Sequence, residues 1–176
     1  RILFGVFGPA YTGPDGLPVA TALIWFGLAG IVFGSVMAIR QTDLKRLLAY
    51  STVAQLGYIG LGIGLASPLA LIGALLHVLN HAMMKSGLFL VAGGIIQRTG
   101  LRSIPRFAGL GKRMPWAMSG FAIAALSMVG IPPLAGFWSK FYLVWASVDL
   151  GNWIAAVVVV SSSLLTMVYF VRLFEQ

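Results

Sequence analysis

The sequence contains no cysteine and few charged residues. The lack of cysteine excludes disulfides, thiolate metal sites and cysteine nucleophiles. Only 9% of the 176 residues are charged, whereas a soluble domain usually has about 25%. By contrast, 59% of the residues are hydrophobic and the mean hydropathy is +0.95. A chain of this size could not hide so much apolar surface from water, so a soluble globular enzyme is excluded, and the low charge excludes a disordered tail.

Acidic residues are scarcer than basic ones. Four Asp and Glu stand against 12 Lys and Arg, which gives a net charge of +8. In a soluble protein a pI near 10.5 would indicate a nucleic-acid partner. Here the basic residues lie mainly at the edges of apolar stretches. We therefore expect the protein to contact a lipid bilayer and not nucleic acid.

Long apolar stretches predict membrane-spanning helices. Such a helix needs about 20 mostly apolar residues, and five stretches meet this requirement, the fourth with an interruption. No stretch alternates polar and apolar residues as a membrane β-strand would, so we predict an all-α polytopic transmembrane bundle. An apolar stub at 2–7 precedes the spans and the chain begins at Arg1 without Met, so we expect a fragment of a longer protein, with 1–176 forming one transmembrane domain. The five predicted spans are 19–39, 47–66, 69–96, 117–146 and 152–171.

The charges of the loops provide an independent test of this topology. Loops that follow alternate spans face the same side of the membrane, and one set, near 8–18, 67–68 and 148–151, contains no Lys or Arg. By the positive-inside rule the other, basic set faces the cytoplasm or an equivalent compartment. We expect an integral protein of a bacterial or archaeal plasma membrane. The basic set contains Arg40, Lys45, Arg46, Arg98, Arg102, Arg106, Lys112, Arg113 and Arg172.

Three titratable residues recur at helical spacing inside the third span. His77, His81 and Lys85 stand at i, i+4 and i+8, which places them on one helix face over about 12 Å. A Lys at the centre of an inserted helix costs on the order of 3 kcal/mol, and a purely structural helix does not require it. This column is typical of a proton relay. The structural alternative is that the histidines bond neighbouring helices and Lys85 pairs with an acid elsewhere, as in a non-conducting scaffold.

The same histidines suggest a second functional class. His at i and i+4 can bind zinc or iron, so His77 and His81 could belong to a membrane-embedded metal enzyme. Such sites normally include a carboxylate or further histidines, and no predicted span contains one. We therefore predict no metal site and no catalytic residue in this chain.

The fourth span carries a helix-breaking sequence. Gly130, Pro132 and Pro133 lie inside it, and two prolines remove two amide donors and clash with the preceding turn. Broken helices in transporters place helix ends and bare carbonyls at the ion site. Lys140 follows the break by seven residues. It either belongs to such a site or extends to the far interface.

Lys45 lies between the first two spans, on the basic side. From composition alone it is an ordinary loop charge, and a local ion pair of Asp43 with Lys45 or Arg46 is plausible. The polar residues Gln55 and Tyr58 follow. They could line water or bond neighbouring helices.

Three motifs of this chain are similar to those of a known family. They are QTDLKRLLAYSTVAQLGYI (41–59), HVLNHAMMKSGLFLVAGGI (77–95) and GIPPLAGFWSKFYL (130–143), with GLGKRMPW (109–116) in agreement. The chain resembles the second half of the antiporter-like membrane subunits shared by respiratory complex I (NADH:quinone oxidoreductase), its chloroplast and hydrogenase relatives, and Mrp-type Na⁺/H⁺ antiporters.

The resemblance implies a fold and a function beyond those derived above. Such subunits have about fourteen helices in two inverted repeats, and this chain would hold most of the second repeat. It implies a proton relay through Lys45, His77, His81, Lys85 and Lys140 in a hetero-oligomeric membrane complex, with Na⁺/H⁺ exchange as the alternative. The chain would not be catalytic alone, although it could serve a proton-pumping oxidoreductase. No cofactor is expected in it, because quinone, flavin and Fe–S clusters would belong to partner subunits of a complex-I-like assembly.

Overall fold

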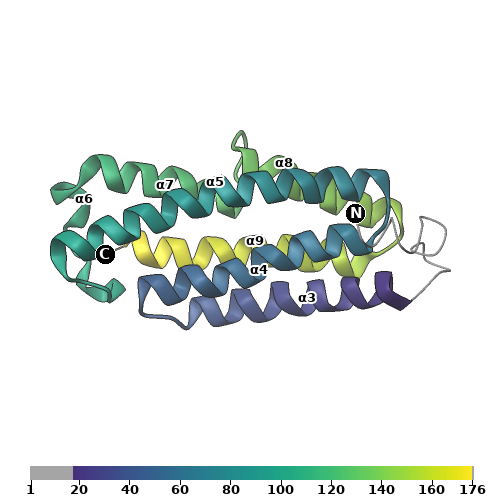
Figure 1. Cartoon of the computed structure of the whole chain (residues 1–176), viewed down its shortest axis with the longest axis horizontal. Coiled ribbons are helices and arrows are strands. Elements are labelled where there is room, and N and C mark those ends of the chain that lie inside the picture. The colour runs from purple at the N-terminus through teal and green to yellow at the C-terminus, as the bar shows by residue number, and fades with distance from the viewer. Residues whose placement is uncertain (1–17, 176) are drawn as a thin grey trace.

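The computed structural model describes residues 18–175, and these residues are almost entirely helical (Figure 1). The predicted stub at 2–7 and the loop near 8–17 lie outside the described residues. The long helices run roughly parallel to the long axis of the bundle (Figure 1). The elements are α3 (Pro18–Ile39), α4 (Leu44–Gly64), α5 (Pro68–Thr99), η1 (Ile104–Arg106), α6 (Leu110–Arg113), α7 (Pro115–Val129), α8 (Ala135–Asp149) and α9 (Trp153–Phe174).

The helices agree with the predicted spans and confirm the all-α fold. α3, α4, α5 and α9 are each long and apolar enough to cross a membrane, and α7 is a shorter apolar helix. The interrupted fourth span corresponds to α7 and α8 together. Large apolar side chains cover the outside of the bundle; Trp25, Phe26 and Leu90, for example, are mostly exposed. An apolar outer surface of this kind is suited to lipid or to other membrane segments.

Short polar signals in the sequence explain where two helices begin. The Asp43 carboxylate accepts a hydrogen bond from the Arg46 backbone N–H at 3.0 Å, and Ser67 accepts one from the Ala70 N–H at 3.2 Å. Both are N-caps, which satisfy amides that have no partner in the first helical turn. α4 therefore begins at Leu44, three residues before the predicted span. Asp43 acts as a cap in place of the side-chain ion pair that the sequence suggested.

Glycines allow α3 and α4 to pack closely. A Cβ atom added at Gly57 would lie 2.6 Å from the Gly27 carbonyl oxygen, and one added at Gly34 would lie 2.5 Å from the Ala54 backbone nitrogen. Small residues that let two backbones approach are typical of helix packing in membranes. The two helices are thereby held at a fixed short distance from each other.

The fourth span is broken where the sequence predicts. α7 ends at Val129, and Gly130 follows in the left-handed region with a φ of 93°. α8 begins at Ala135, and the connection between them projects from the bundle (Figure 1). The Pro132–Pro133 peptide bond is cis. The predicted break at Gly130, Pro132 and Pro133 is therefore confirmed.

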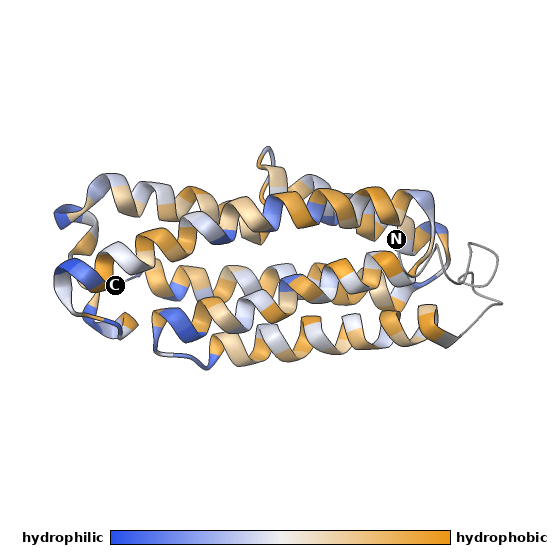
Figure 2. Ribbon diagram, viewed as in Figure 1, coloured by the Kyte–Doolittle hydropathy of each residue, from blue (hydrophilic) through white to orange (hydrophobic). Residues whose placement is uncertain are grey.

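The basic residues gather at one end of the bundle. The α3–α4 loop, the end of α5 and the segment through η1 and α6 meet there, and Figure 2 shows this end as the more hydrophilic one. The Leu44 backbone N–H donates to the Arg102 carbonyl at 3.0 Å, and the Ile104 N–H donates to Thr42 at 2.8 Å. These bonds join two loops that are distant in sequence. The predicted segregation of charge is thus present in the fold.

Candidate functional site

Buried polar residues lie between two apolar clusters of the core. One cluster, with Leu48, Leu88 and Tyr169, occupies the basic half of the bundle, and the other, with Leu61 and Leu143, occupies the opposite half. Along α3, α4 and α9 the polar positions fall between the residues of the two clusters, and on α5 Lys85 follows Met84, a residue of the first cluster. This polar layer consists of Ser35 on α3, Ser51 and Gln55 on α4, His77 and Lys85 on α5, Ser139 and Lys140 on α8, and Ser162 and Thr166 on α9.

His77 is fully buried and joins three helices. Its Nδ1 lies 2.9 Å from Ser139 Oγ on α8, and its Nε2 lies 3.0 Å from Gln55 Oε1 on α4. Since a carbonyl oxygen only accepts, the His77 Nε2–H donates to Gln55 Oε1. In a neutral ring Nδ1 then accepts a hydrogen bond from the Ser139 hydroxyl. When the ring is charged, Nδ1–H donates instead, and the Ser139 hydroxyl bonds to the Gly136 carbonyl, 3.1 Å away. The contacts of His77 can therefore hold either protonation state.

His81 continues the column toward Lys85. Its ring stacks with that of His77, with a centroid distance of 6.4 Å and an interplanar angle of 3°. Its buried Nε2 has no hydrogen-bond partner among the residues that the structure describes. The predicted column of His77, His81 and Lys85 is thus present on one face of α5, with an open hydrogen-bonding position in the middle.

The Lys85 ammonium group crosses to α4. This side chain is only 6% exposed. Its Nζ donates to the Leu48 carbonyl at 2.7 Å and to the Ser51 hydroxyl, and it lies 5.9 Å from the centre of the Phe89 ring. Dipolar groups and an aromatic ring surround the charge, and no carboxylate is paired with it in residues 18–175. The acid partner of the structural alternative is therefore not found in the described part of the chain.

The Lys140 ammonium group binds the end of the broken helix. Lys140 is also 6% exposed. From α8 its Nζ donates to the Met128 and Val129 carbonyls of α7 at 2.8 and 3.2 Å, and to Ser163 Oγ of α9 at 3.1 Å. Carbonyls at a helix C-terminus carry partial negative charge and favour a cation. Lys140 therefore belongs to the buried polar layer and does not extend to the far interface.

Other side chains complete the hydrogen bonds of the break. Asn80 Nδ2 on α5 donates to the Ala135 carbonyl at 2.8 Å, and Ser127 Oγ accepts from the Gly136 backbone N–H at 3.2 Å. A Cβ atom at Gly136 would overlap the Ser127 carbonyl oxygen, so only glycine fits there. Non-helical backbone at membrane depth is stable only where protein or water satisfies it. The break is therefore a supported feature of the site.

Tyr58 lies between His77 and Lys140 and contacts both. Its ring centre lies 5.1 Å from that of His77, and Lys140 Nζ lies 5.0 Å above the Tyr58 ring. Sequence reasoning singled out Gln55 and Tyr58 only as polar residues near a span. Ser51 and Ser163 gave no signal of their own, because single serines are common in membrane helices.

Lys45 lies apart from the other predicted relay residues. It is exposed in the first turn of α4, within the basic end of the bundle. The structure brings His77, His81, Lys85 and Lys140 into one layer and does not bring Lys45 to it. A place for Lys45 in the buried column is therefore not supported, because its side chain is at the surface.

The two histidines do not form a metal centre with other ligands. In the described ranges no group of three or more His, Cys, Asp or Glu side chains comes together. Both ring nitrogens of His77 are already engaged by Gln55 and Ser139. A metal ion on His77 would have to replace one of these hydrogen bonds.

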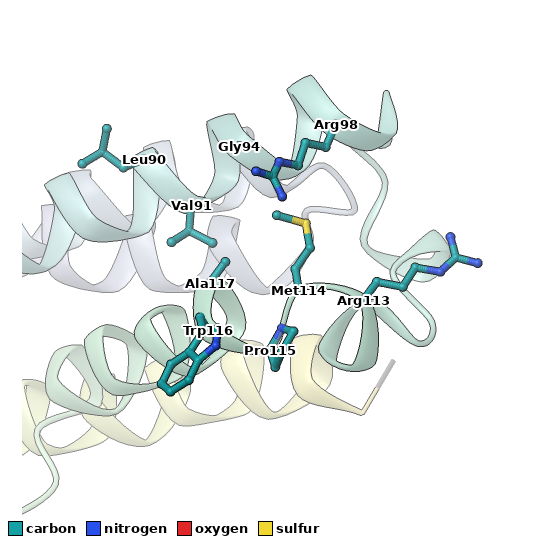
Figure 3. A pocket seen from close by; sticks show the side chains of 9 residues that line it. All are labelled: Leu90, Val91, Gly94, Arg98, Arg113, Met114, Pro115, Trp116 and Ala117. Atoms are coloured by element: carbon teal, nitrogen blue, oxygen red, sulfur yellow. The ribbon is translucent and has the colours of Figure 1, made fainter.

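A groove of about 490 Å³ lies at the basic end, away from the buried layer. Figure 3 shows the Arg98 side chain reaching into it from α5 and the Arg113 side chain turned away. Apolar residues form most of its lining. The groove shares no residue with the polar layer.

Comparison with known proteins supports the resemblance. Residues 6–166 match the model of a family described as NADH:quinone oxidoreductase/Mrp antiporter, transmembrane region. The chain belongs to this family. It is 53% identical over 175 residues to NADH-quinone oxidoreductase subunit N of Desulforudis audaxviator, covering 99% of this chain and 34% of that protein. It is 40% identical over 149 residues to a Na⁺/H⁺ antiporter subunit of Alkalihalophilus pseudofirmus, covering 84% of this chain and 30% of that one.

Solved structures of this antiporter-like family share the fold. A chain of the Mrp complex from Dietzia sp. DQ12-45-1b aligns with 89% of this chain, with a TM-score of 0.86 and 33% sequence identity. The alignment covers 29% of that Mrp chain. A chain of respiratory complex I from Thermus thermophilus aligns with 99% of this chain, with a TM-score of 0.85 and 27% sequence identity. The alignment covers 36% of that complex I chain. The chain thus spans about a third of the length of these relatives. The predicted membership and membrane architecture are confirmed.

Proposed function

We propose that this chain is part of a membrane subunit that translocates protons through its buried lysines and histidines. The observation that carries the proposal is the position of Lys85 and Lys140. Both ammonium groups lie in the polar layer between the two apolar clusters, bound by carbonyls and hydroxyls and without a carboxylate partner in residues 18–175. Charges at that depth are costly and mark ion or proton pathways.

The mechanism is a transfer of charge between titratable groups. Protonation of one lysine raises the free energy of a positive charge on the next group, and so favours release of its proton onward. His77 and His81 supply groups between Lys85 and the α8 side of the layer. The two hydrogen-bond arrangements of His77 allow it to take up and release a proton without moving its ring.

The broken helix gives Lys140 a means of coupling charge to structure. Its ammonium group holds the carbonyls of Met128 and Val129, so the charged form fastens α8 to the end of α7. A neutral amine would bind these carbonyls less strongly, because charge-assisted hydrogen bonds are about twice as strong as neutral ones. Proton transfer at Lys140 would therefore change the strength of the contact across the break.

An external source of energy has to drive the cycle. The relatives named above include subunits of quinone oxidoreductases and of Na⁺/H⁺ antiporters, and the solved relatives are parts of complexes. We infer that other membrane subunits are partners here as well. Any quinone, flavin or Fe–S cluster would reside in those partners. We place the protein in a bacterial or archaeal plasma membrane with its basic loops in the cytoplasm, because positive charge is retained on that side.

A Lys85→Met variant of the complete subunit tests the proposal. It is reconstituted with its complex in proteoliposomes, and proton uptake is followed with a pH-sensitive dye. We expect loss of proton uptake with the complex still assembled, because Met fills a similar volume and carries no proton. Lys112→Met, at an exposed position of α6, is the matched control. Normal uptake by Lys85→Met would contradict the proposal.

Direct Na⁺ transport is the alternative within the same family. Radioactive Na⁺ flux, measured in the same vesicles with and without a proton gradient, separates the two functions. Proton-only translocation predicts no Na⁺ flux that depends on Lys85.

A further inference from the structure

The groove at the basic end of the bundle has no part in the proposed relay. It lies between the last turns of α5 and the start of α7 and holds about 490 Å³. Leu90, Val91, Gly94 and Arg98 of α5 line it, and Trp116 of α7 stands opposite (Figure 3). The groove is therefore a separate feature of the fold, bordered by two helices.

The groove is charged at one end and apolar at the other. Successive residues of an α-helix rise by about 1.5 Å, so the backbone of Arg98 lies about 12 Å nearer the basic end than that of Leu90. Figure 3 shows the Arg98 side chain over the groove and Leu90 and Val91 farther along α5. Trp116 is 91% exposed, and Trp side chains of membrane proteins favour the headgroup level. The groove thus extends from the membrane interface toward the hydrocarbon.

The charges of the groove favour a negatively charged occupant. Arg98 and Arg113 are its basic residues, and none of the described residues that line it is acidic. Exposed basic side chains of the same end, such as Arg102 and Lys112, add to the positive potential. An Arg guanidinium donates two parallel hydrogen bonds to a phosphate, and basic pockets between membrane helices bind lipid headgroups. A phosphate therefore complements the charged end, and an acyl chain complements the apolar end.

The size of the groove favours a lipid over another membrane helix. A helix with its side chains is about 10–12 Å wide and rises about 5.4 Å per turn. The volume of about 490 Å³ is therefore that of about one helical turn. A spanning helix has about 20 residues and would extend far beyond the groove. An acyl chain is narrower and fits a short apolar track between two helices.

We propose that this groove binds one anionic phospholipid. The Arg98 guanidinium holds the phosphate, and an acyl chain lies along Leu90 and Val91. A zwitterionic phospholipid binds less tightly, because its own ammonium group offsets the phosphate charge and no carboxylate of the described lining receives that ammonium. The site does not depend on the proposed proton relay.

A photoactivatable phosphatidylglycerol with a diazirine in one acyl chain tests the site. The complete subunit within its complex is placed in phosphatidylcholine vesicles that contain a small fraction of this probe. After irradiation, mass spectrometry of peptides locates the adducts. We expect adducts at 90–91 and 116–117, which unlabelled phosphatidylglycerol suppresses and inorganic phosphate does not. A phosphatidylcholine carrying the same diazirine, used at the same fraction, should give fewer adducts there.

Two variants act on the groove in different ways. Arg98→Gln removes the guanidinium, and we expect about tenfold fewer adducts or less, since a hydrogen bond to a charged group contributes about that factor. Gly94→Leu fills the groove, and a Cβ atom added at Gly94 meets nothing within 4 Å, so the helix accommodates it. Its adducts should be lost.

Each variant has a matched control. Arg106→Gln removes an exposed charge of the same end that does not line the groove. Gly93→Leu adds the same side chain at the neighbouring glycine, whose added Cβ also meets nothing within 4 Å. Both controls should be labelled like the unmodified protein.

Three results would overturn the site. They are equal labelling of Arg98→Gln and Arg106→Gln, equal labelling by the two lipid probes, and a density map of the complex with a protein segment in the groove. Proton uptake enters none of these measurements, so a failure here leaves the proposed function standing.

Discussion

At the scale of single residues, the environment of a side chain decides which of the many basic residues can take part in transport. Lys85 and Lys140 are buried and held by carbonyls and hydroxyls, whereas Lys45 is exposed in the first turn of α4. An exposed lysine is hydrated and exchanges its proton with bulk solvent. Only a buried charge responds strongly to a change of charge on its neighbour, because solvent screens the others.

Lys45 therefore gives a residue-scale prediction. We expect Lys45→Met to retain proton uptake to within about a factor of two, because the exposed side chain lies outside the buried polar layer. Substitutions at exposed positions also change the free energy of unfolding little, so the variant should fold. The assay is the proteoliposome uptake described for Lys85→Met, which serves as the inactive reference. A loss as large as that of the reference would return Lys45 to the relay.

At the scale of elements, close contacts between backbones hold the polar layer together. α3 and α4 approach through glycines, and α8 meets the end of α7 at Gly136. Such contacts leave no room for a side chain. The distances across the layer therefore depend on residues that carry no chemistry of their own.

The α3–α4 contact gives a prediction about stability. Gly57→Ala places a Cβ atom 2.6 Å from the Gly27 carbonyl oxygen, and we expect it to destabilise the subunit by about 1–3 kcal/mol. Thermal unfolding of the purified protein in detergent measures the change. Gly93→Ala, on α5, is the control, since nothing lies within 4 Å of its added Cβ. An unchanged melting temperature for Gly57→Ala would show that the two helices separate at little cost.

At the scale of the whole molecule, charge is segregated between the two ends of the bundle. The loops through 40–46 and 98–113 meet at one end (Figure 2), and Asp149 lies at the end of α8 on the opposite side. This asymmetry is a property of the topology, because it appears only when successive spans alternate in direction. The positive-inside rule then predicts an orientation for the whole bundle.

Labelling of single cysteines tests the orientation, and this chain helps because it contains no cysteine of its own. Lys112→Cys and Asp149→Cys are made separately in an otherwise cysteine-free subunit. In intact cells a membrane-impermeant maleimide should label Asp149→Cys and leave Lys112→Cys unlabelled until the membrane is opened. The reverse pattern would show that the basic end faces outward.

The sequence by itself determined the helical class, the spans, the break at Gly130–Pro133 and the column of His77, His81 and Lys85. These features follow from local rules: hydropathy over a span, the missing amides of proline, and the period of one helix. Only the tertiary structure decided that Lys140 binds the end of α7, that Lys45 stays at the surface, and that Ser51, Gln55 and Ser163 meet the relay residues. Those contacts join residues far apart in the chain, so the packing of helices against one another, and not the period within one of them, brings them together.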